Sequence, residues 1–271
     1  MTEDVIINYA EQLEEAAAGD WSNPELGSHP ARIHSMTFLD RFAPTFRKVK
    51  KDAVLHVMVR FELFDEIEDE ETEEVTVTPV EGRNFLTKVF SFKWADKGHF
   101  TIMLASLYPK HCTIKAKPAD DVFNKMIGAL PNKVVMVNIV SDGDEQEGGA
   151  PKYVKIAEVT KASIAVAKLV PESSEPDTMG ITLYKDITEE QIRYLKGYEV
   201  RQLIEDGENY ATSNAKTVLE AIRKEEPDFA VKKESDDKKP KAKPDAKADK
   251  PLPKPDADTD VPEDLDQDEE V

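Results

Sequence analysis

Cationic and aromatic side chains alternate in one short stretch of the chain, from Arg41 to Lys51. This stretch holds five basic residues, two phenylalanines and no carboxylate. Cations bind the phosphates of a nucleic acid, and flat rings stack on bases whatever the base sequence. The pattern predicts contacts to single-stranded nucleic acid, made by Arg41, Phe42, Phe46, Arg47, Lys48, Lys50 and Lys51. The alternative is a solvated loop whose phenylalanines fold back onto the core.

A second set of candidates lies on two predicted strands. Residues 85 to 95 place Leu86, Lys88, Phe90, Phe92 and Trp94 on one face. A row of aromatic residues is more often core than a binding platform, but a lysine on the same face opposes that interpretation. We expect phosphate contacts and one stacking ring from the following residues: Arg60, Lys88, Lys93 and Trp94.

The charge of the chain is unevenly distributed. The net charge is -19, yet residues 32–60 carry seven basic and two acidic residues, and residues 83–117 carry seven basic and one acidic. Residues 256–271 carry nine acidic residues and no basic one. This distribution favours a body that binds a polyanion and a tail that competes for the same surface or recruits a partner. A solubilising tail without a partner is the alternative.

Catalytic and metal-binding patterns are weak. The chain has no Gly-x-Ser-x-Gly, P-loop or Gly-x-Gly-x-x-Gly motif. His29 and His34 lack a nearby carboxylate pair, and the acidic stretches 62–74 and 142–147 lack EF-hand spacing. We therefore expect no enzyme, no cofactor and no metal site.

Cysteine usage and hydropathy point to a cytoplasmic protein. Cys112 is the only cysteine, which excludes an intramolecular disulfide and fits a reducing compartment. The first residues are acidic and lack the apolar region of a signal peptide. No run of about 18 apolar residues exists, so we expect no membrane span.

The hydrophobic periodicity predicts the elements that position these side chains. Alternation predicts strands at 31–39, 53–63, 85–95, 133–140 and 152–159. Helical spacing predicts one helix at 100–107 and a short one at 122–127. This order is that of an OB-fold, a five-stranded Greek-key barrel with a helix between strands three and four. A small α+β sheet would show the same order. The acidic residues 65–71 are expected to form a solvated hairpin loop.

Four regions follow from these elements. Residues 1–26 hold an N-terminal helix, at 3–18, and a link. Residues 27–168 form the OB-fold-like domain of a mainly β, α+β protein. Residues 169–228 form a helical extension, within which the capping-box sequence Thr188–Gln191 starts a helix. Residues 229–271 form a Lys/Asp/Pro-rich linker and an acidic tip, which are expected to be disordered.

Several stretches resemble a group of phage-encoded proteins of the single-stranded-DNA-binding kind. They cover roughly residues 27 to 210 and are loose patterns rather than invariant signatures. The stretches that carry the resemblance are 27–33, 57–65, 88–100, 132–138, 152–156 and 195–204. The resemblance implies an OB-fold body that acts in phage DNA replication or recombination.

The acidic tail is similar to the tails of bacterial and phage single-strand-binding proteins. Those tails recruit replication and repair partners and compete with DNA for the barrel. This tail departs from their pattern, because it ends in Val271 rather than in an aromatic residue after proline. The likeness implies a partner-binding segment that comprises Asp264, Leu265, Asp266, Asp268, Glu269, Glu270 and Val271.

Together these patterns predict a non-enzymatic protein that coats single-stranded DNA without sequence preference. Its partners would be phage or host replication and recombination proteins. A phage structural or adaptor protein that binds other proteins is the alternative. A metal-dependent enzyme acting on nucleic acid is a third, weaker option.

Overall fold

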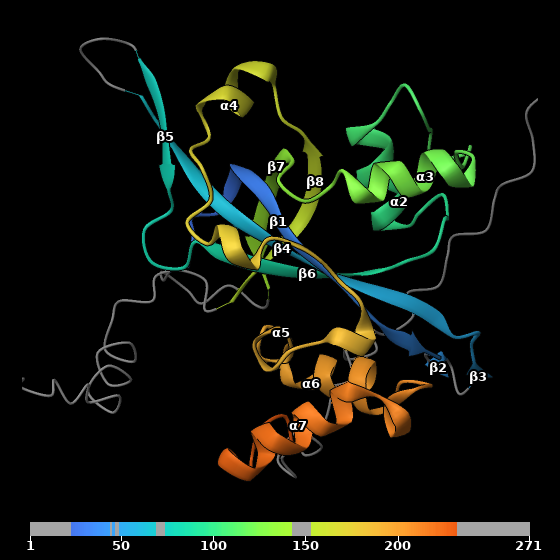
Figure 1. Cartoon of the computed structure of the whole chain (residues 1–271). Helices are drawn as coiled ribbons and strands as arrows, with labels where there is room; N and C mark the ends of the chain where they lie inside the picture. Colours follow the sequence, from blue (N-terminus) through green and yellow to red (C-terminus); the bar gives the residue numbers. More distant parts are fainter. Residues whose placement is uncertain (1–22, 44, 47–48, 69–73, 143–152, 232–271) are drawn as a thin grey trace, which may run out of the picture. The chain divides into compact units, whose positions relative to one another are not determined.

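The structure is a computed structural model that describes residues 23–43, 45–46, 49–68, 74–142 and 153–231 (Figure 1). Contacts divide the chain into two units, Met1–Lys232 and Lys233–Val271. All described residues belong to the first unit. The predicted N-terminal helix and acidic tip lie outside the described residues.

A large, mostly antiparallel sheet of seven strands is the centre of this unit (Figure 1). Its two long strands, β1 (Gly27–Phe42) and β4 (Val54–Glu68), pair with each other. The other edge of β4 pairs with β6 (Phe85–Ser91) and then with β5 (Val75–Pro79). The other edge of β1 pairs with β7 (Val134–Ser141), and β7 pairs with β8 (Val154–Lys161). The protein is therefore a mixed α+β protein, as the sequence predicts.

One face of this sheet forms the main core with two helices. The alternating residues Val57, Val59, Phe61 and Leu63 are fully buried there. The core is closed by α2 (His99–Leu107) and α3 (Asp120–Gly128), which lie side by side in Figure 1. The predicted helical spacing is confirmed, because α2 buries Phe100, Met103, Leu104 and Leu107.

The opposite face of β1 and β4 is buried as well. Leu39 and Met58 point away from the main core into a second core with the C-terminal helices, which lie together below the sheet in Figure 1. Ile192, Leu203 and Leu219 are among the helical residues of this core. The elements of this region are α5 (Glu189–Arg193), α6 (Gly197–Glu199), the π-helical η3 (Val200–Glu205), η4 (Tyr210–Thr212) and α7 (Asn214–Glu225).

The C-terminal helices are anchored by specific polar contacts. Thr188 and Gln191 form the predicted capping box at the start of α5. The carboxylate of Asp40, at the end of β1, is buried and accepts hydrogen bonds from the backbone and side-chain amides of Asn209 at 2.5 and 2.8 Å. A Cβ on Gly207 would lie 2.6 Å from Oδ2 of Asp40, so glycine permits this close approach.

The segment between β8 and α5 consists of short elements. It contains α4 (Ile164–Leu169) and two 3-10 turns, η1 (Pro176–Thr178) and η2 (Tyr184–Asp186). It also contains a short strand, β9 (Gly180–Thr182), which pairs in parallel with Ser35–Thr37 of β1. Sequence reasoning missed β9 because three residues are too short to show a period.

Two further predictions are corrected. The acidic stretch from residue 65 was expected to be a loop, but residues 65–68 continue β4 and pair with β5. We call this β4–β5 pair the acidic hairpin. Val77 and Val80 are buried and hold this hairpin against the rest of the unit. The strand predicted to reach residue 95 ends at Ser91, so Phe92 and Trp94 lie in the link to α2.

The sheet is not closed by a backbone ladder between β6 and β8. Instead, the ammonium group of Lys88 donates hydrogen bonds to the carbonyls of Ile156 and Ala157, both at 2.8 Å. A side chain thus spans the gap between these two strands.

Candidate nucleic-acid interface

The predicted basic stretch forms the far end of the β1–β4 pair. Arg41 and Phe42 pair with Leu55 and Val54, which places residues 43–53 beyond the ladder. Within this end, β2 (Thr45–Phe46) pairs with β3 (Val49–Lys50), as Figure 1 shows. We call residues 41–51 the basic hairpin.

The described side chains of the basic hairpin differ in exposure. Arg41 and Lys51 are exposed. Phe42 is half-buried, packs against the second core and lies 6.4 Å from the ring of His56. Part of its ring is therefore unavailable for stacking. The side chains of Phe46, Arg47, Lys48 and Lys50 lie outside the described residues.

A second basic segment meets the hairpin at the same end of the sheet. The backbone N–H of Phe92 donates to the carbonyl of Leu55 at 2.7 Å, which ties the loop after β6 to the start of β4. Lys93 and Lys97 are exposed in this loop. The structure thus brings Lys93 close to the basic hairpin, although about 40 residues separate them in the sequence.

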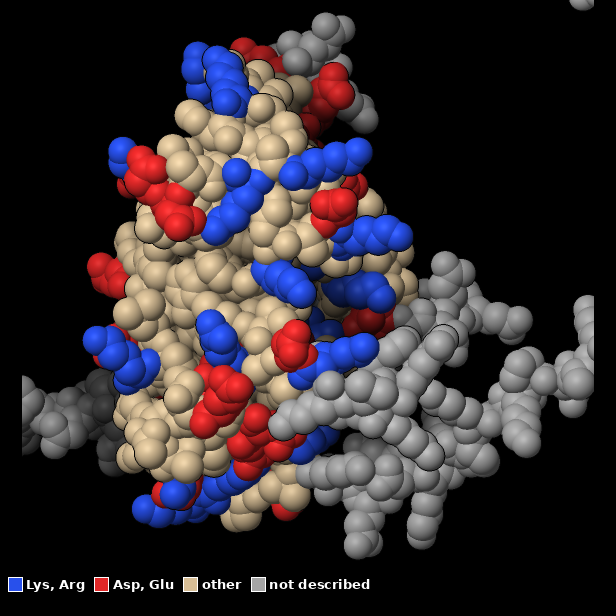
Figure 2. Space-filling model, turned by 90° about the vertical axis from the view of Figure 1, so that its right-hand side faces the viewer, with Lys and Arg blue, Asp and Glu red and all other residues tan. Residues whose placement is uncertain are grey.

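Figure 2 shows the face on the side where α2, α3, β2 and β3 lie in Figure 1. Lys and Arg side chains gather along one side of this face, with carboxylates interspersed. Residues 97–119 contribute four lysines and no carboxylate to this part of the chain. Asp96 and Asp120 flank this segment, and Lys117 forms an ion pair with Asp120 at 2.9 Å, so part of its positive charge is balanced.

Trp94 does not point freely into solvent. Its ring lies 6.1 Å from that of Phe123 and packs against the main core. Its indole Nε1 is buried and has no hydrogen-bond partner among the described residues. Stacking of a base on Trp94 would require the ring to leave this contact, so the predicted role stays a prediction.

Arg60 is held inside the protein. Its guanidinium donates to Oε2 of Glu175 at 2.7 Å and lies 3.8 Å from the ring centroid of Phe85 and 4.3 Å from that of Tyr194. The side chain is 8% exposed. In this arrangement Arg60 positions the segment before β9 on the sheet, and a phosphate contact would require the ion pair to open.

Lys88 is also directed away from the surface. The pKa of its ammonium group is lowered to about 8, mainly by burial; Glu158 opposes this shift and Lys155 adds to it. Its two carbonyl contacts on β8 take the place of phosphate oxygens. The structure therefore gives Lys88 a bridging position within the sheet.

The low pKa of Lys88 makes stability depend on pH. Between about pH 8 and 10.5 the unfolded chain binds more protons than the folded one, so the free energy of unfolding rises with pH across this window. Below pH 8 both states are protonated and the desolvation cost is fully present. We expect the melting temperature of the wild type to rise relative to that of Lys88→Met between pH 7.5 and 10. A difference that stays constant across this range would contradict the burial of this charge.

A buried polar cluster on the outer face of the sheet was missed by sequence reasoning. Glu62 accepts hydrogen bonds from the backbone and hydroxyl of Ser174 at 2.8 and 2.7 Å. Arg32 donates to the carbonyl of Pro171, and His34 contacts the carbonyl of Glu175 at 2.8 Å. Burial lowers the pKa of His34. The partners lie more than 100 residues apart, so no local sequence pattern predicts these contacts.

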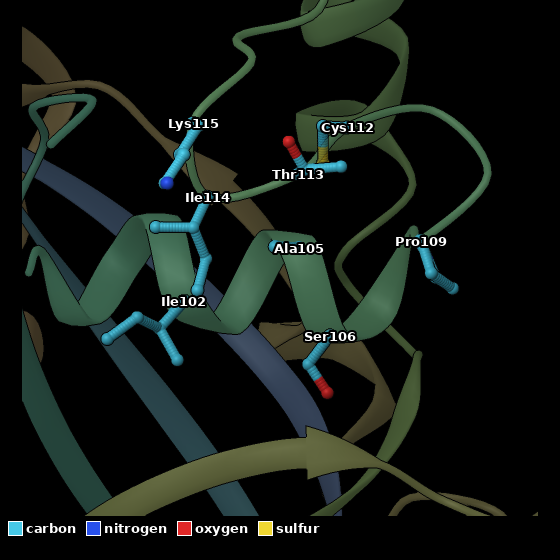
Figure 3. A pocket seen from close by; sticks show the side chains of 8 residues that line it. All are labelled: Ile102, Ala105, Ser106, Pro109, Cys112, Thr113, Ile114 and Lys115. Carbon is cyan, nitrogen blue, oxygen red and sulfur yellow. The ribbon is translucent and has the colours of Figure 1, made fainter. Parts of the chain in front are cut away.

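An open apolar groove of about 530 Å³ lies between α2 and the loop that follows it (Figure 3). Ile102 and Ala105 of α2 face Ile114 across it, and Pro109 and Lys115 stand at its edge. Cys112 is buried beside the groove, and burial raises the pKa of its thiol. A buried thiol of this kind packs as a small apolar group.

Comparisons with known proteins give no relatives. No family model, no curated protein and no solved structure matches this chain. The described part of the chain holds no cluster of three or more histidine, cysteine or acidic side chains arranged to bind a metal ion. Within the same residues, no helix combines the length and apolar character needed to cross a membrane.

Proposed function

We propose that this protein binds single-stranded DNA without sequence preference, in phage DNA replication or recombination, and is not an enzyme. The observation that carries the proposal is the meeting of two basic segments at one end of the sheet. The basic hairpin follows β1, and the loop with Lys93 and Lys97 is bonded to the start of β4. A single strand that crosses this end would meet cations from both segments.

The element order supports the same proposal. The main strands β1, β4 and β6, the helices α2 and α3, and then β7 and β8 follow one another as in an OB-fold. Lys88 bridges β6 and β8, the strands that would close the barrel. In OB-folds the loop between strands one and two binds nucleic acid, and the basic hairpin occupies that place. The face of strands two and three, the other common OB surface, is covered here by the C-terminal helices. The proposed contact is therefore confined to the hairpin end.

The alternative is a phage structural or adaptor protein that binds other proteins. The apolar groove beside α2 is the observation that favours it, because an exposed apolar surface with a lysine at its edge suits a protein contact. Binding of single-stranded DNA separates the two functions.

The proposal predicts preferential, salt-sensitive binding of single strands. About four to six phosphate contacts would give a slope of roughly -3 to -4 when the logarithm of affinity is plotted against that of salt. We expect fluorescence anisotropy with labelled poly-dT to show this slope, and a duplex of equal length to bind more weakly. Equal affinity for the duplex, or no binding at low salt, would overturn the proposal.

A further inference from the structure

A second pocket, of about 430 Å³, lies between the turn before β6 and helix α5. It is separate from the hairpin end, because the six-residue step from Phe85 to Ser91 along β6 spans about 20 Å. Its walls include three arginines, two aromatic rings and one carboxylate. They are Arg60, Arg83, Phe85, Glu175, Arg193 and Tyr194.

The turn that carries Arg83 is fixed by the backbone. Gly82 has a φ of +77°, the left-handed region that glycine adopts without strain. The N–H of Asn84 donates to the carbonyl of Gly82 at 3.1 Å, and the carbonyl of Asn84 accepts from the N–H of Leu63 at 2.7 Å. Arg83 is therefore presented to the pocket from a turn that is pinned to β4.

The three arginines of the pocket are not equally paired with carboxylates. Arg60 is neutralised by Glu175 at 2.7 Å. Arg193 is neutralised by Glu189 and Glu226, at 2.9 and 2.7 Å. Arg83 has neither an ion pair nor a hydrogen bond to any residue that the structure describes.

Arg83 is also half-buried. Burial alone lowers the pKa of its guanidinium, with no carboxylate opposing the shift. A guanidinium stays protonated in proteins, so it cannot escape the desolvation cost by losing its proton. A partly buried charge without a partner is costly, and an anion that enters the pocket would remove that cost.

We propose that this pocket binds the phosphate group of a phosphate ester, with the guanidinium of Arg83 as its main contact. The planar fork of an arginine binds two phosphate oxygens at once. A phosphate still offers a further oxygen to the side-chain amide of Asn84, which also lines the pocket. In a carboxylate both oxygens would face the fork, whereas a tetrahedral phosphate directs its other oxygens elsewhere. The phosphate comes from a free nucleotide or from the backbone of a single strand.

Thermal unfolding of the full chain tests this site without DNA. We expect inorganic phosphate at tenfold its dissociation constant to raise the melting temperature by about 3–5 °C over chloride of equal ionic strength. Arg83→Leu should abolish this rise. In chloride the same variant should melt no lower than the wild type, because it removes an unpaired, partly buried charge. Lys224→Leu removes an exposed cation from α7 and should leave the phosphate effect intact.

Two outcomes would overturn the site. If phosphate stabilises Arg83→Leu as much as the wild type, the anion binds elsewhere. If Arg83→Leu melts lower in chloride, Arg83 has a structural role instead. This test does not depend on the proposed function, which is tested separately by binding of poly-dT.

The source of the phosphate is then decided with two ligands. Titration with thymidine monophosphate and with a labelled dT oligomer would be compared in the wild type and Arg83→Leu. At least a tenfold loss for the mononucleotide alone assigns the site to free nucleotides. A comparable loss for the oligomer assigns it to the DNA backbone. An unchanged affinity for both ligands would overturn the proposal.

Discussion

Replacing Lys48 and Lys50 together by glutamate is expected to weaken binding of single-stranded DNA at least tenfold at low salt. The double change reverses two charges in the basic hairpin and replaces two attractions to phosphates by two repulsions. The slope of log affinity against log salt should become shallower by about 1.4, since two phosphate contacts are lost. Anisotropy titrations with labelled poly-dT at several salt concentrations measure both quantities.

A matched control separates the hairpin from net charge. Lys185→Glu with Lys224→Glu makes the same change in total charge at two exposed positions of the C-terminal region. This control should lower the affinity less than threefold. The melting temperature of Lys48→Glu/Lys50→Glu should stay within about 2 °C of the wild type, because the β1–β4 ladder ends at Phe42 and Val54, before these positions. A collapse in stability, or an equal loss in the control, would contradict a binding role for the hairpin.

The periodicity of the sequence was sufficient to predict the main elements. The alternation from Leu55 to Leu63 gave β4, and the helical spacing of Phe100, Met103, Leu104 and Leu107 gave α2. Both patterns are local, and each buries one side of an element in the main core. The capping box of α5 is likewise a local signal, because its two partners lie three residues apart.

Periodicity could not show that the second face of the sheet is covered. Met58 and Arg60 alternate with core residues, and the sequence gives them the features of an exposed face. Their surroundings come from segments that are more than 100 residues away, such as Glu175 and Tyr194. The phosphate role predicted for Arg60 assumed an exposure that these distant segments remove, and Lys88 is engaged by the carbonyls of β8 instead.

The acidic hairpin shows a second limit of sequence reasoning. Asp65 to Glu68 are charged or exposed for the most part, which favours a loop by composition. The strand continues nevertheless, because backbone pairing with β5 does not depend on side-chain charge and Val77 supplies a buried anchor. One buried valine among polar neighbours is too weak a signal to be read from the sequence.

Deleting Asp256 to Val271 is expected to strengthen binding of single-stranded DNA at low salt. The deleted residues carry nine acidic side chains and no basic one, so they resemble a strand of phosphates in charge. The linker expected from about residue 232 to 255 would, as a random coil, have a root-mean-square reach on the order of 25–30 Å. The tip would then compete with DNA at an effective concentration on the order of millimolar.

The salt dependence of this effect identifies its cause. Screening weakens the attraction between the tip and the basic hairpin, so the gain on deletion should be largest near 20 mM salt and small above 300 mM salt. The melting temperature should not change, because every described core residue precedes Lys232. Anisotropy with labelled poly-dT compares the full chain and the deletion variant at each salt concentration.

A control that replaces the same residues by a neutral Gly/Ser segment should bind DNA as the deletion does, because charge rather than length causes the competition. If the deletion binds no more tightly at low salt, the tail does not inhibit DNA binding, and its acidic residues act only in solubility or in recruiting a partner.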